Sequence, residues 1–400
     1  VRLAAQSGLR VTAMSTTRAR ENATLSFGKP ASRGSVEETF YPWTLTVDRF
    51  TAQGLMPVYG QATSPDPETE RFFPTAFGDD TLRYEALFGF DPVRRISFAL
   101  PFRRLDDVLL AEDASSVTRQ NSHGQVVKID KATGRTRKLL EAVRDRADWQ
   151  RIKAAGEALA ERYFTKARIA QAYGHLRDAH QRGDFPVRLN LEGFFWTPRE
   201  LMGIEPHLFA FYDQPDLLHA INETILDVYT QKLPLLLELI PADVVYIMED
   251  LSGKNGPMLS PELFDAFVGS YYARLVPVLK ANGVRHVFVD TDGDFMRLIP
   301  HFIKAGIEGF LPLDVNAGMD ITAVRRLYPE LKLIGGYNKL RIAEGQDAIE
   351  REFERILPVI RQGGYIPGAD HQVPPSASLE DYRFYIRLLK AAMTQSGLDT

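Results

Sequence analysis

The 400-residue chain contains no cysteine. This absence excludes disulfide bonds, thiolate metal sites and a cysteine nucleophile. Any metal that the chain binds must therefore be held by oxygen and nitrogen ligands. A chain without cysteine also suits a reducing compartment, so we expect the protein to be cytoplasmic.

The sequence also lacks a long apolar run. Its most apolar segment, 233–240, is short and contains Glu238, whereas a membrane-spanning helix needs about 18 or more apolar residues. Residues 1–13 carry two arginines but no apolar core of the signal-peptide kind. We expect no membrane segment. We interpret 1–13 as an extension that is either disordered or the product of a misassigned start at Val1, with Met14 as the natural one.

An excess of charge of one sign is missing too. The formal net charge is -4 and the isoelectric point is about 6.1, which gives no electrostatic basis for binding nucleic acid. Apolar residues make up 44% and charged residues 25%, as in ordinary globular proteins. The length fits one decorated barrel, so we expect a single domain over 14–400.

The first half of the chain is irregular, with two recognisable β segments, at 94–100 and 117–139. Residues 117–139 have strand-like alternation, and Gly and charged residues separate Val126-Val127 from Leu139-Leu140. This pattern predicts a β-hairpin. We therefore expect an insertion at 117–149, followed by a helix over 149–174.

From Pro186 onward the pattern becomes regular. Short apolar runs alternate with longer amphipathic stretches, as expected for parallel strands joined by crossover helices. The expected strands lie at 187–195, 244–248, 286–289, 309–313, 331–334 and 364–366. The expected helices lie between them at 198–239, 261–281, 295–305, 320–328 and 348–362, and a last one follows at 379–393. Ser260-Pro261 and Ser378 have the residue types that begin helices.

Two architectures fit this alternation, an open doubly wound sheet and a closed barrel. The open sheet usually carries a GxGxxG turn after its first strand, and no such motif occurs. A barrel places polar functional residues at the C-terminal ends of its strands. All six expected strands end in an acid, an amide or an imidazole. We therefore predict an α/β fold, a (β/α)8 TIM barrel with an N-terminal extension and a β-hairpin insertion.

The polar strand ends define the candidate site. Carboxylates that share a cleft raise one another's pKa, so they can hold a proton, bind a divalent metal or accept the N–H groups of a pyrrole. We predict that the catalytic residues are Asp290, Asp292, His371 and Glu249. Glu249, Asp292 and His371 are the predicted metal ligands, with zinc as the first candidate. The predicted substrate-binding residues are Glu192, Phe195, Trp196, Asp314, Asn338 and Tyr337.

Each candidate has a structural alternative. The run 290–294 could be a turn that caps the next helix, and a calcium loop is disfavoured because the expected final Glu is missing. His371 could be a hydrogen-bonded loop residue. Glu249 could be one of two acids at a helix start, and Phe195 and Trp196 could belong to the core.

Four segments resemble the uroporphyrinogen decarboxylase superfamily. They read EDLSGKNGPMLSPELFDAF from Glu249, VDTDGDFMRLIPHFIKAGIEGFLPLDVNAGMDI from Val289, LIGGYNK from Leu333 and GGYIPGADHQVPPSASLEDYRFYIRLL from Gly363. The segment LNLEGFFWTPRELMGIE from Leu189 is similar to the stretch that precedes the family's substrate pocket. The resemblance is strong after Phe185 and weak before it.

The resemblance implies a barrel enzyme with one of two chemistries. The decarboxylases remove acetate carboxylates from a tetrapyrrole without a cofactor, and their C-terminal histidine falls on His371. Their relatives are zinc-dependent methyltransferases that move methyl groups between small molecules and a corrinoid protein. This chain has FYPWTLTVDRF from Phe40 in place of the decarboxylases' RQAGRY-like arginine loop. It has Asp290-x-Asp292 in place of the methyltransferases' His-x-Cys zinc ligands.

We favour a methyltransferase that demethylates a small methoxylated or otherwise methylated compound and works with a corrinoid protein. The missing arginine loop disfavours an eight-carboxylate substrate, and a site of O and N ligands suits ethers or alcohols better than thiolates. A cofactor-independent carboxy-lyase acting on a tetrapyrrole and a non-catalytic tetrapyrrole- or corrinoid-binding protein are the alternatives. The resemblance also suggests a homodimer.

Overall fold

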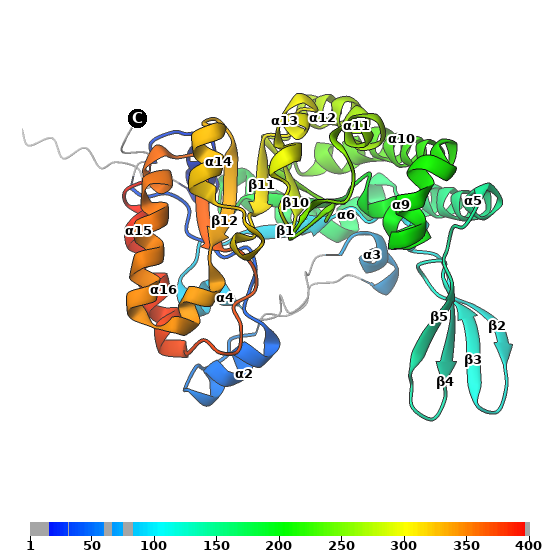
Figure 1. Ribbon diagram of the computed structural model, residues 1–400, viewed down its shortest axis with the longest axis horizontal. Coiled ribbons are helices and arrows are strands. Elements are labelled where there is room, and N and C mark those ends of the chain that lie inside the picture. The colour runs from blue at the N-terminus through cyan, green and yellow to red at the C-terminus, as the bar shows by residue number, and fades with distance from the viewer. Residues whose placement is uncertain (1–15, 31, 60–65, 75–82, 397–400) are drawn as a thin grey trace, which may run out of the picture.

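The computed structural model describes residues 16–30, 32–59, 66–74 and 83–396. A curled sheet of parallel strands lies at its centre, and helices cover the sheet's outer face (Figure 1). In order across the sheet, the strands are β1 (Arg94–Ser97), β6 (Val187–Glu192), β7 (Val244–Met248), β10 (His286–Thr291), β11 (Gly309–Pro312), β12 (Lys332–Tyr337) and β13 (Tyr365–Ala369). The expected α/β barrel class is confirmed, with seven parallel strands in the described part of the chain.

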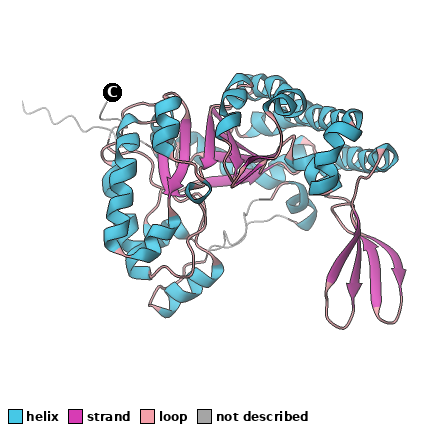
Figure 2. Cartoon of the chain, viewed as in Figure 1, coloured by secondary structure: helices cyan, strands magenta, loops and turns pink. Residues whose placement is uncertain are grey.

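Helices follow nearly every strand and run back along the outside of the sheet (Figure 2). Before β6 the helices are α1 (Thr17–Leu25), α2 (Thr44–Ala52), α3 (Pro67–Phe72), α4 (Tyr84–Phe88), α5 (Arg146–Tyr163), α6 (Lys166–Tyr173) and α7 (Arg177–Arg182). After β6 they are α8 (Trp196–Met202), α9 (Ile204–Asp213), α10 (Pro215–Leu239), α11 (Pro261–Phe264), α12 (Ser270–Ala281), α13 (Ile299–Lys304), α14 (Ile321–Leu327), α15 (Gln346–Gln362) and α16 (Leu379–Met393). The two predicted N-caps are confirmed, because the hydroxyls of Ser260 and Ser378 accept backbone N–H groups.

Successive residues of each strand face opposite sides of the sheet. On β7, Val244 and Tyr246 belong to a small apolar cluster inside the barrel, whereas Val245 and Ile247 pack in the large core under the helices. The inner cluster consists of Leu25, Val244, Tyr246, Phe288, Leu311, Ile334 and Ile366. This alternation determines which strand-end side chains reach the barrel mouth, since positions two apart share a face.

The N-terminal segment 35–39 contacts both edge strands of the sheet. Arg95 on β1 donates hydrogen bonds to the carbonyl oxygens of Glu38 and Thr39, at 3.2 and 3.1 Å. The backbone N–H of Ala369 on β13 donates to the Glu38 carboxylate at 2.7 Å. Residues of this segment therefore connect the first strand to the last.

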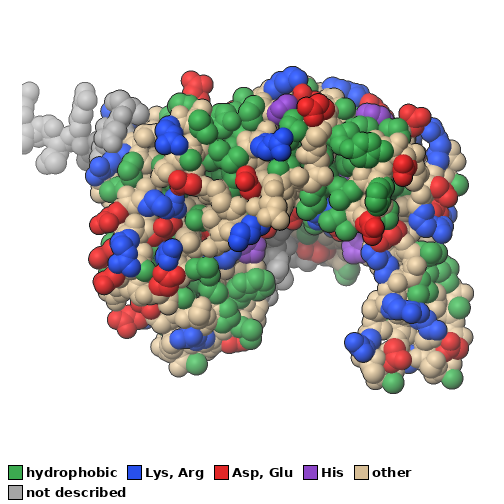
Figure 3. All heavy atoms as spheres, viewed as in Figure 1, with side chains coloured by type: hydrophobic (Ala, Val, Ile, Leu, Met, Phe, Trp, Pro, Cys, Tyr) green, Lys and Arg blue, Asp and Glu red, His purple; other side chains and the backbone are tan. Residues whose placement is uncertain are grey.

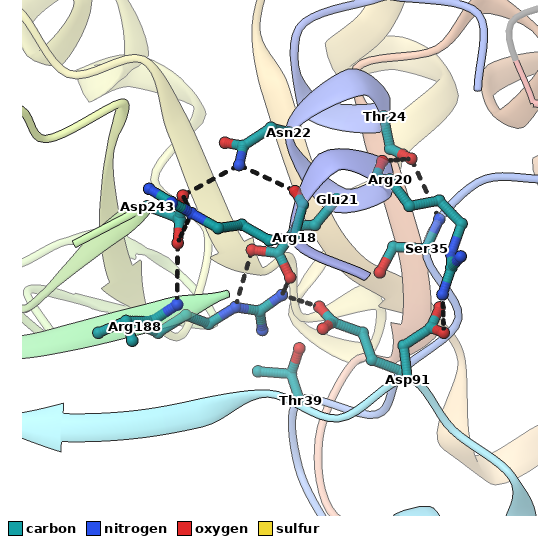
Figure 4. A network of polar contacts seen from close by, with 12 residues as sticks. Arg18, Arg20, Glu21, Asn22, Thr24, Ser35, Thr39, Asp91, Arg188 and Asp243 are labelled. Atoms are coloured by element: carbon teal, nitrogen blue, oxygen red, sulfur yellow. Dashed lines mark hydrogen bonds and ion pairs between the residues drawn. The ribbon is translucent and has the colours of Figure 1, made fainter. Parts of the chain in front are cut away.

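Helix α1 plugs the N-terminal end of the barrel. Leu25 inserts into the inner cluster, and Arg18 and Asn22 donate hydrogen bonds to the buried carboxylate of Asp243, at 2.8 and 2.9 Å (Figure 4). Arg188 of β6 donates hydrogen bonds to the carboxyl groups of Glu21 and Glu37, and all three side chains are buried. The positive charge of Arg188 thereby has partners, as a buried charge needs.

The predicted insertion is larger than a hairpin. It is a four-stranded antiparallel sheet of consecutive strands: β2 (Val108–Glu112), β3 (Ser116–Gln120), β4 (Val126–Asp130) and β5 (Thr136–Leu140). This sheet projects away from the barrel (Figure 1). Its first strand escaped prediction because VLLAE has no polar–apolar alternation.

The region predicted as one helical stretch at 198–239 is divided into α8, α9 and α10. Gly203, with φ of 82°, separates the first two helices, and Gln214, with a non-helical φ of -139° and ψ of 47°, precedes Pro215 of α10. The interpretation of residues 1–13 concerns residues that lie outside the described part of the chain. In the part of the chain that is described, helices of the length and apolarity that a membrane span requires are absent.

Candidate active site

Three aspartates gather at the C-terminal ends of β7 and β10. Asp290 follows Phe288 by two positions on β10 and so shares its inward face, whereas Asp250 lies two residues beyond the end of β7 in a left-handed backbone conformation, with φ of 39°. The backbone N–H of Asp292 donates to the Asp250 carboxylate at 3.2 Å. We call Asp250, Asp290 and Asp292 the acidic site.

Asp290 lies where its carboxyl group resists ionisation. Burial is the largest cause, and the neighbouring charges of Asp250 and Asp292 add to it, so the pKa of Asp290 is well above its ordinary value. The hydrogen bonds of the described residues include none to this carboxyl group. Asp290 therefore favours its protonated form more strongly than an exposed aspartate does.

Asp292 is more accessible, with 42% of its side chain exposed. Burial and the charges of Asp250 and Asp314 raise the pKa of Asp292 to about 6, while Lys339 opposes the shift. A carboxyl group with this pKa changes its protonation state close to neutral pH. Asp290 and Asp292 thus differ in role: one favours the neutral form, and the other can ionise.

His371 faces the acidic site from the end of β13. Its Nε2 atom lies 3.8 Å from an Asp292 carboxylate oxygen. Its ring stacks on Phe40, with ring centres 5.0 Å apart, and lies 6.5 Å from the ring of Trp43. Burial and the charge of Lys339 lower the pKa of His371, so its imidazole is neutral at pH 7.

Asp370, Asp314 and Asn338 organise the loops around the site. The Asp370 carboxylate accepts N–H groups from Val315 and Lys339, both at 3.0 Å, and thereby ties together the ends of β11, β12 and β13. Asp314 caps the turn that follows it, and Asn338 accepts the N–H of the residue two positions on. Asp314 and Asn338 thus hydrogen-bond within their own loops, and their predicted contact with substrate stays a prediction.

Glu249 occupies a different place from the one predicted. It belongs to the outward-facing row of β7, and its carboxylate accepts the backbone N–H groups of Phe194, Phe195 and Trp196, at 2.9 to 3.0 Å. The hydroxyl of Tyr272 donates to the same carboxylate. Glu249 therefore stabilises the start of α8, because an anion is favoured at a helix N-terminus.

The predicted zinc ligands do not come together. Both Glu249 oxygens are already engaged and fully buried, whereas Asp292 and His371 lie at the mouth. Among the described residues, the His, Asp and Glu side chains form no group of three arranged to hold a metal ion. Zinc bound by Glu249, Asp292 and His371 does not fit this arrangement.

Glu192 and Trp196 lie on the other side of the mouth, at the end of β6. The Glu192 carboxylate pairs with Arg103 at 3.1 Å, and Arg103 also pairs with Glu200 at 3.1 Å. The half-buried Trp196 ring is covered by the guanidinium of Arg199, 4.2 Å from the ring centre. On this side of the mouth the acidic side chains are paired with arginines, unlike the three aspartates of the acidic site.

Phe195 and Tyr337 lie outside the acidic site. The ring of Phe195 packs on His207 of α9, and the ring of Tyr337 packs between Phe353 and Tyr385 of α15 and α16. Both rings are fully buried. Their predicted role in substrate binding rested on their position after a strand, which does not tell which face a side chain takes.

Four neighbours of the site were missed from the sequence. Asp250 was passed over in favour of Glu249, because both acids lie beyond the end of β7 and Asp250 takes a left-handed backbone conformation that strand alternation does not predict. Lys339 follows Asn338 and is the cation that acts on Asp292, Asp370 and His371. Phe40 and Trp43 belong to the segment FYPWTLTVDRF, which was considered only as a replacement for the arginine loop. Their contact with His371 joins residues that are far apart in the sequence.

The family model described as uroporphyrinogen decarboxylase (URO-D) matches residues 118–392 of the chain. Among solved structures, the chain is similar to a methyltransferase from Methanosarcina mazei. The two share 13% sequence identity and a TM-score of 0.57, over 94% of this chain and 98% of the other. A Xaa-Pro dipeptidase with bound methionine is a more distant neighbour, with 15% identity, coverage of 63% and 67%, and a TM-score of 0.29. No curated protein matches the sequence.

Proposed function

Because this chain belongs to the uroporphyrinogen decarboxylase family, we propose that it is a methyltransferase that moves a methyl group from a small methylated compound to a corrinoid protein. The observation that carries the proposal is the acidic site, in which Asp290, a carboxyl group whose pKa is raised by burial, lies beside Asp292, whose pKa is about 6. The similarity to the Methanosarcina mazei methyltransferase over most of both chains supports the fold on which this chemistry would take place.

Removal of a methyl group from an ether or alcohol needs a proton for the departing oxygen. A bound corrinoid would supply the methyl acceptor. As the carbon–oxygen bond breaks, the carboxyl group of Asp290 would donate its proton to the leaving oxygen and become a carboxylate. Such general acid catalysis contributes about 10²- to 10⁴-fold to a rate.

The groups around Asp290 would orient the substrate and restore the proton. His371 is neutral, faces Asp292 and is open on one side to the mouth, so it can pass a proton inward from solvent. Phe40 and Trp43 provide flat apolar surfaces beside it, which suit an aromatic or aliphatic methoxy compound. Lys339 would keep part of the acidic site ionised.

The proposal is tested by following methyl transfer to reduced cobalamin from a panel of methoxylated and other methylated compounds. We expect wild-type protein to form methylcobalamin with at least one of them. Asp290→Asn should lower the rate about 100-fold or more, because the amide cannot donate an acidic proton. Glu354→Gln, an exposed change on α15, is the matched control and should retain the wild-type rate.

A carboxy-lyase acting on a tetrapyrrole is the second candidate. The gathering of Asp250, Asp290 and Asp292 favours it, because carboxylates accept hydrogen bonds from pyrrole N–H groups. Release of CO₂ from uroporphyrinogen by wild-type protein, and its loss in Asp290→Asn, would support this reaction. Methyl transfer without CO₂ release would exclude it.

A further inference from the structure

Four side chains form one row along the inner wall of the barrel, on neighbouring strands from β6 to β11. The strand pairing places Glu192 beside Met248, and Met248 beside Asp290. Leu311 follows beside Asp290 and belongs to the inner apolar cluster. Met248 faces the interior as Tyr246 does, since positions two apart on a strand share a face. Met248 therefore lies between two strands that each carry a carboxyl group, about 5 Å away on either side.

Met248 differs in its surroundings from the other partly buried methionines. It is half-buried at the last position of β7. Met258 and Met296 are also partly buried, but both pack against the large core. Met248 is a member of neither apolar cluster of the described residues. Its thioether therefore presents apolar surface that those residues do not enclose.

Both neighbours of Met248 also have hydrogen-bonding capacity that the described chain does not use. The Oε1 atom of Glu192 accepts a hydrogen bond from Arg103 at 3.1 Å, whereas its Oε2 atom is buried and has no partner among the described residues. The hydrogen bonds of those residues include none to the carboxyl group of Asp290 either. Buried polar atoms normally have partners. Three adjacent inward-facing side chains thus point to a ligand that supplies the missing contacts.

A small molecule can reach this row through the hollow of the molecule. The space-filling view shows the hollow between α2 and the β2–β5 sheet (Figure 3). His371, on one side of the mouth, contacts Trp43, the residue before α2. Arg103, which pairs with Glu192 on the other side, lies shortly before β2. The mouth therefore opens toward the hollow.

We propose that Met248 determines the size of the alkyl group that the site accepts, because the methyl group to be transferred packs sideways against its thioether. This inference rests on the proposed function, since it concerns the substrate of that reaction. A methyl ether has the matching pattern of groups, an apolar methyl beside an oxygen that can face Asp290. Contact from the side leaves the face of the methyl carbon opposite the oxygen free for the methyl acceptor.

The surroundings of Met248 explain why a longer alkyl group would be rejected. An added methylene would have to displace the thioether or lie against the carboxyl group of Glu192 or Asp290. The second arrangement is unfavourable, because a polar group that loses water without gaining a hydrogen bond costs free energy. The unbranched thioether can adjust to the shape of a single methyl group. Met248 would thus act through size and not through a chemical step.

A comparison of methyl and ethyl ethers tests the proposal. We measure kcat/KM for alkyl transfer to reduced cobalamin from 4-methoxyphenol and from 4-ethoxyphenol, and take the ratio of the two values. Met248→Ala should lower this ratio about tenfold or more, because the shorter side chain leaves room for the added methylene. Met248→Leu keeps most of the volume and should keep the ratio of wild type. Met56→Ala is the matched control, since Met56 is 83% exposed, and it should keep the ratio as well.

Isothermal titration calorimetry with the same two phenols separates this inference from the proposed function, because binding needs neither cobalamin nor turnover. Wild-type protein should bind 4-methoxyphenol about tenfold or more tightly than 4-ethoxyphenol, and Met248→Ala should remove the difference. Met248→Phe, which fills the space, should weaken the binding of both phenols.

The two measurements together decide between the possible outcomes. The expected binding pattern without methyl transfer would support Met248 as the size-determining residue and overturn the proposed function. Methyl transfer with the same methyl-to-ethyl ratio in Met248→Ala as in wild type would overturn the inference and leave the proposed function intact. Failure of wild-type protein to bind either phenol would also overturn the inference.

Discussion

Asp292 is the residue whose titration we expect to see in the pH dependence of the reaction. Its pKa is raised to about 6, so the carboxyl group is protonated below that pH and ionised above it. If the ionised form orients His371, kcat/KM should rise with pH through about 6 and level off. Asp292→Asn should flatten this limb, and an unchanged limb in the variant would contradict the assignment.

Glu249 also follows a strand, but we expect it to stabilise the fold and not to take part in the reaction. Glu249→Ala would leave three buried backbone N–H groups and the Tyr272 hydroxyl without their acceptor. We expect the free energy of unfolding to fall by about 2–4 kcal/mol. Urea denaturation measures it, with the exposed Glu354→Ala as control, and a loss no larger than the control's would refute the capping role.

The difference between Asp292 and Glu249 shows how much of the site the sequence could predict for single residues. The six polar strand ends could be recognised from the sequence, because residue type and position after an apolar run are local features. Which of two adjacent acids faces the mouth is harder to predict, because Glu249 and Asp250 both lie beyond the end of β7 and Asp250 has a left-handed backbone with φ of 39°. The stacking of Phe40 on His371 joins segments far apart in the chain and leaves no local signal.

Among the elements, α1 has a role that its sequence does not reveal. The helix is polar, but Leu25 is fully buried within the inner cluster of the barrel. Leu25→Ala should lower the free energy of unfolding by about 2–5 kcal/mol, because it opens a cavity against Tyr246 and its neighbours. Denaturant titration tests this, and a loss below about 1 kcal/mol would show that α1 does not seal the barrel.

The sequence pattern predicted the βα units more completely than it predicted the inserted sheet. The later strands were recognised because each is an apolar run followed by a well-capped helix, as at Ser260 and Ser378. The insertion was seen only in part, since both of its edge strands are exposed along their whole length. Without a buried face, β2 lacks the alternation by which a strand is identified.

At the scale of the whole molecule, buried acids should make the protein less stable as the pH rises above 7. Burial raises the pKa of Glu21 and of Glu38 to about 8 in the folded state. The unfolded chain ionises these groups near pH 4, so from there to about pH 8 the folded state binds more protons and loses relative stability as pH rises. The buried histidines His207 and His286 have lowered pKa values of about 3 and titrate on unfolding only below about pH 7.

We therefore expect the melting temperature to fall between pH 7 and pH 9. Calorimetry in buffers of equal ionic strength measures this change. Glu38→Gln should reduce the fall, because the amide has no proton to lose. A melting temperature that rises over the same range would contradict the assignment of raised pKa values to these buried acids.

The protonation state of Asp290 at neutral pH is the most direct test of the account. An infrared difference spectrum of wild type minus Asp290→Asn, recorded across pH 5 to 9, isolates the carbonyl stretch of this one carboxyl group. We predict the band of a protonated carboxylic acid at pH 7, because burial and the charges of Asp250 and Asp292 oppose ionisation. A carboxylate band throughout this range would contradict the role of Asp290 as the proton donor of the acidic site.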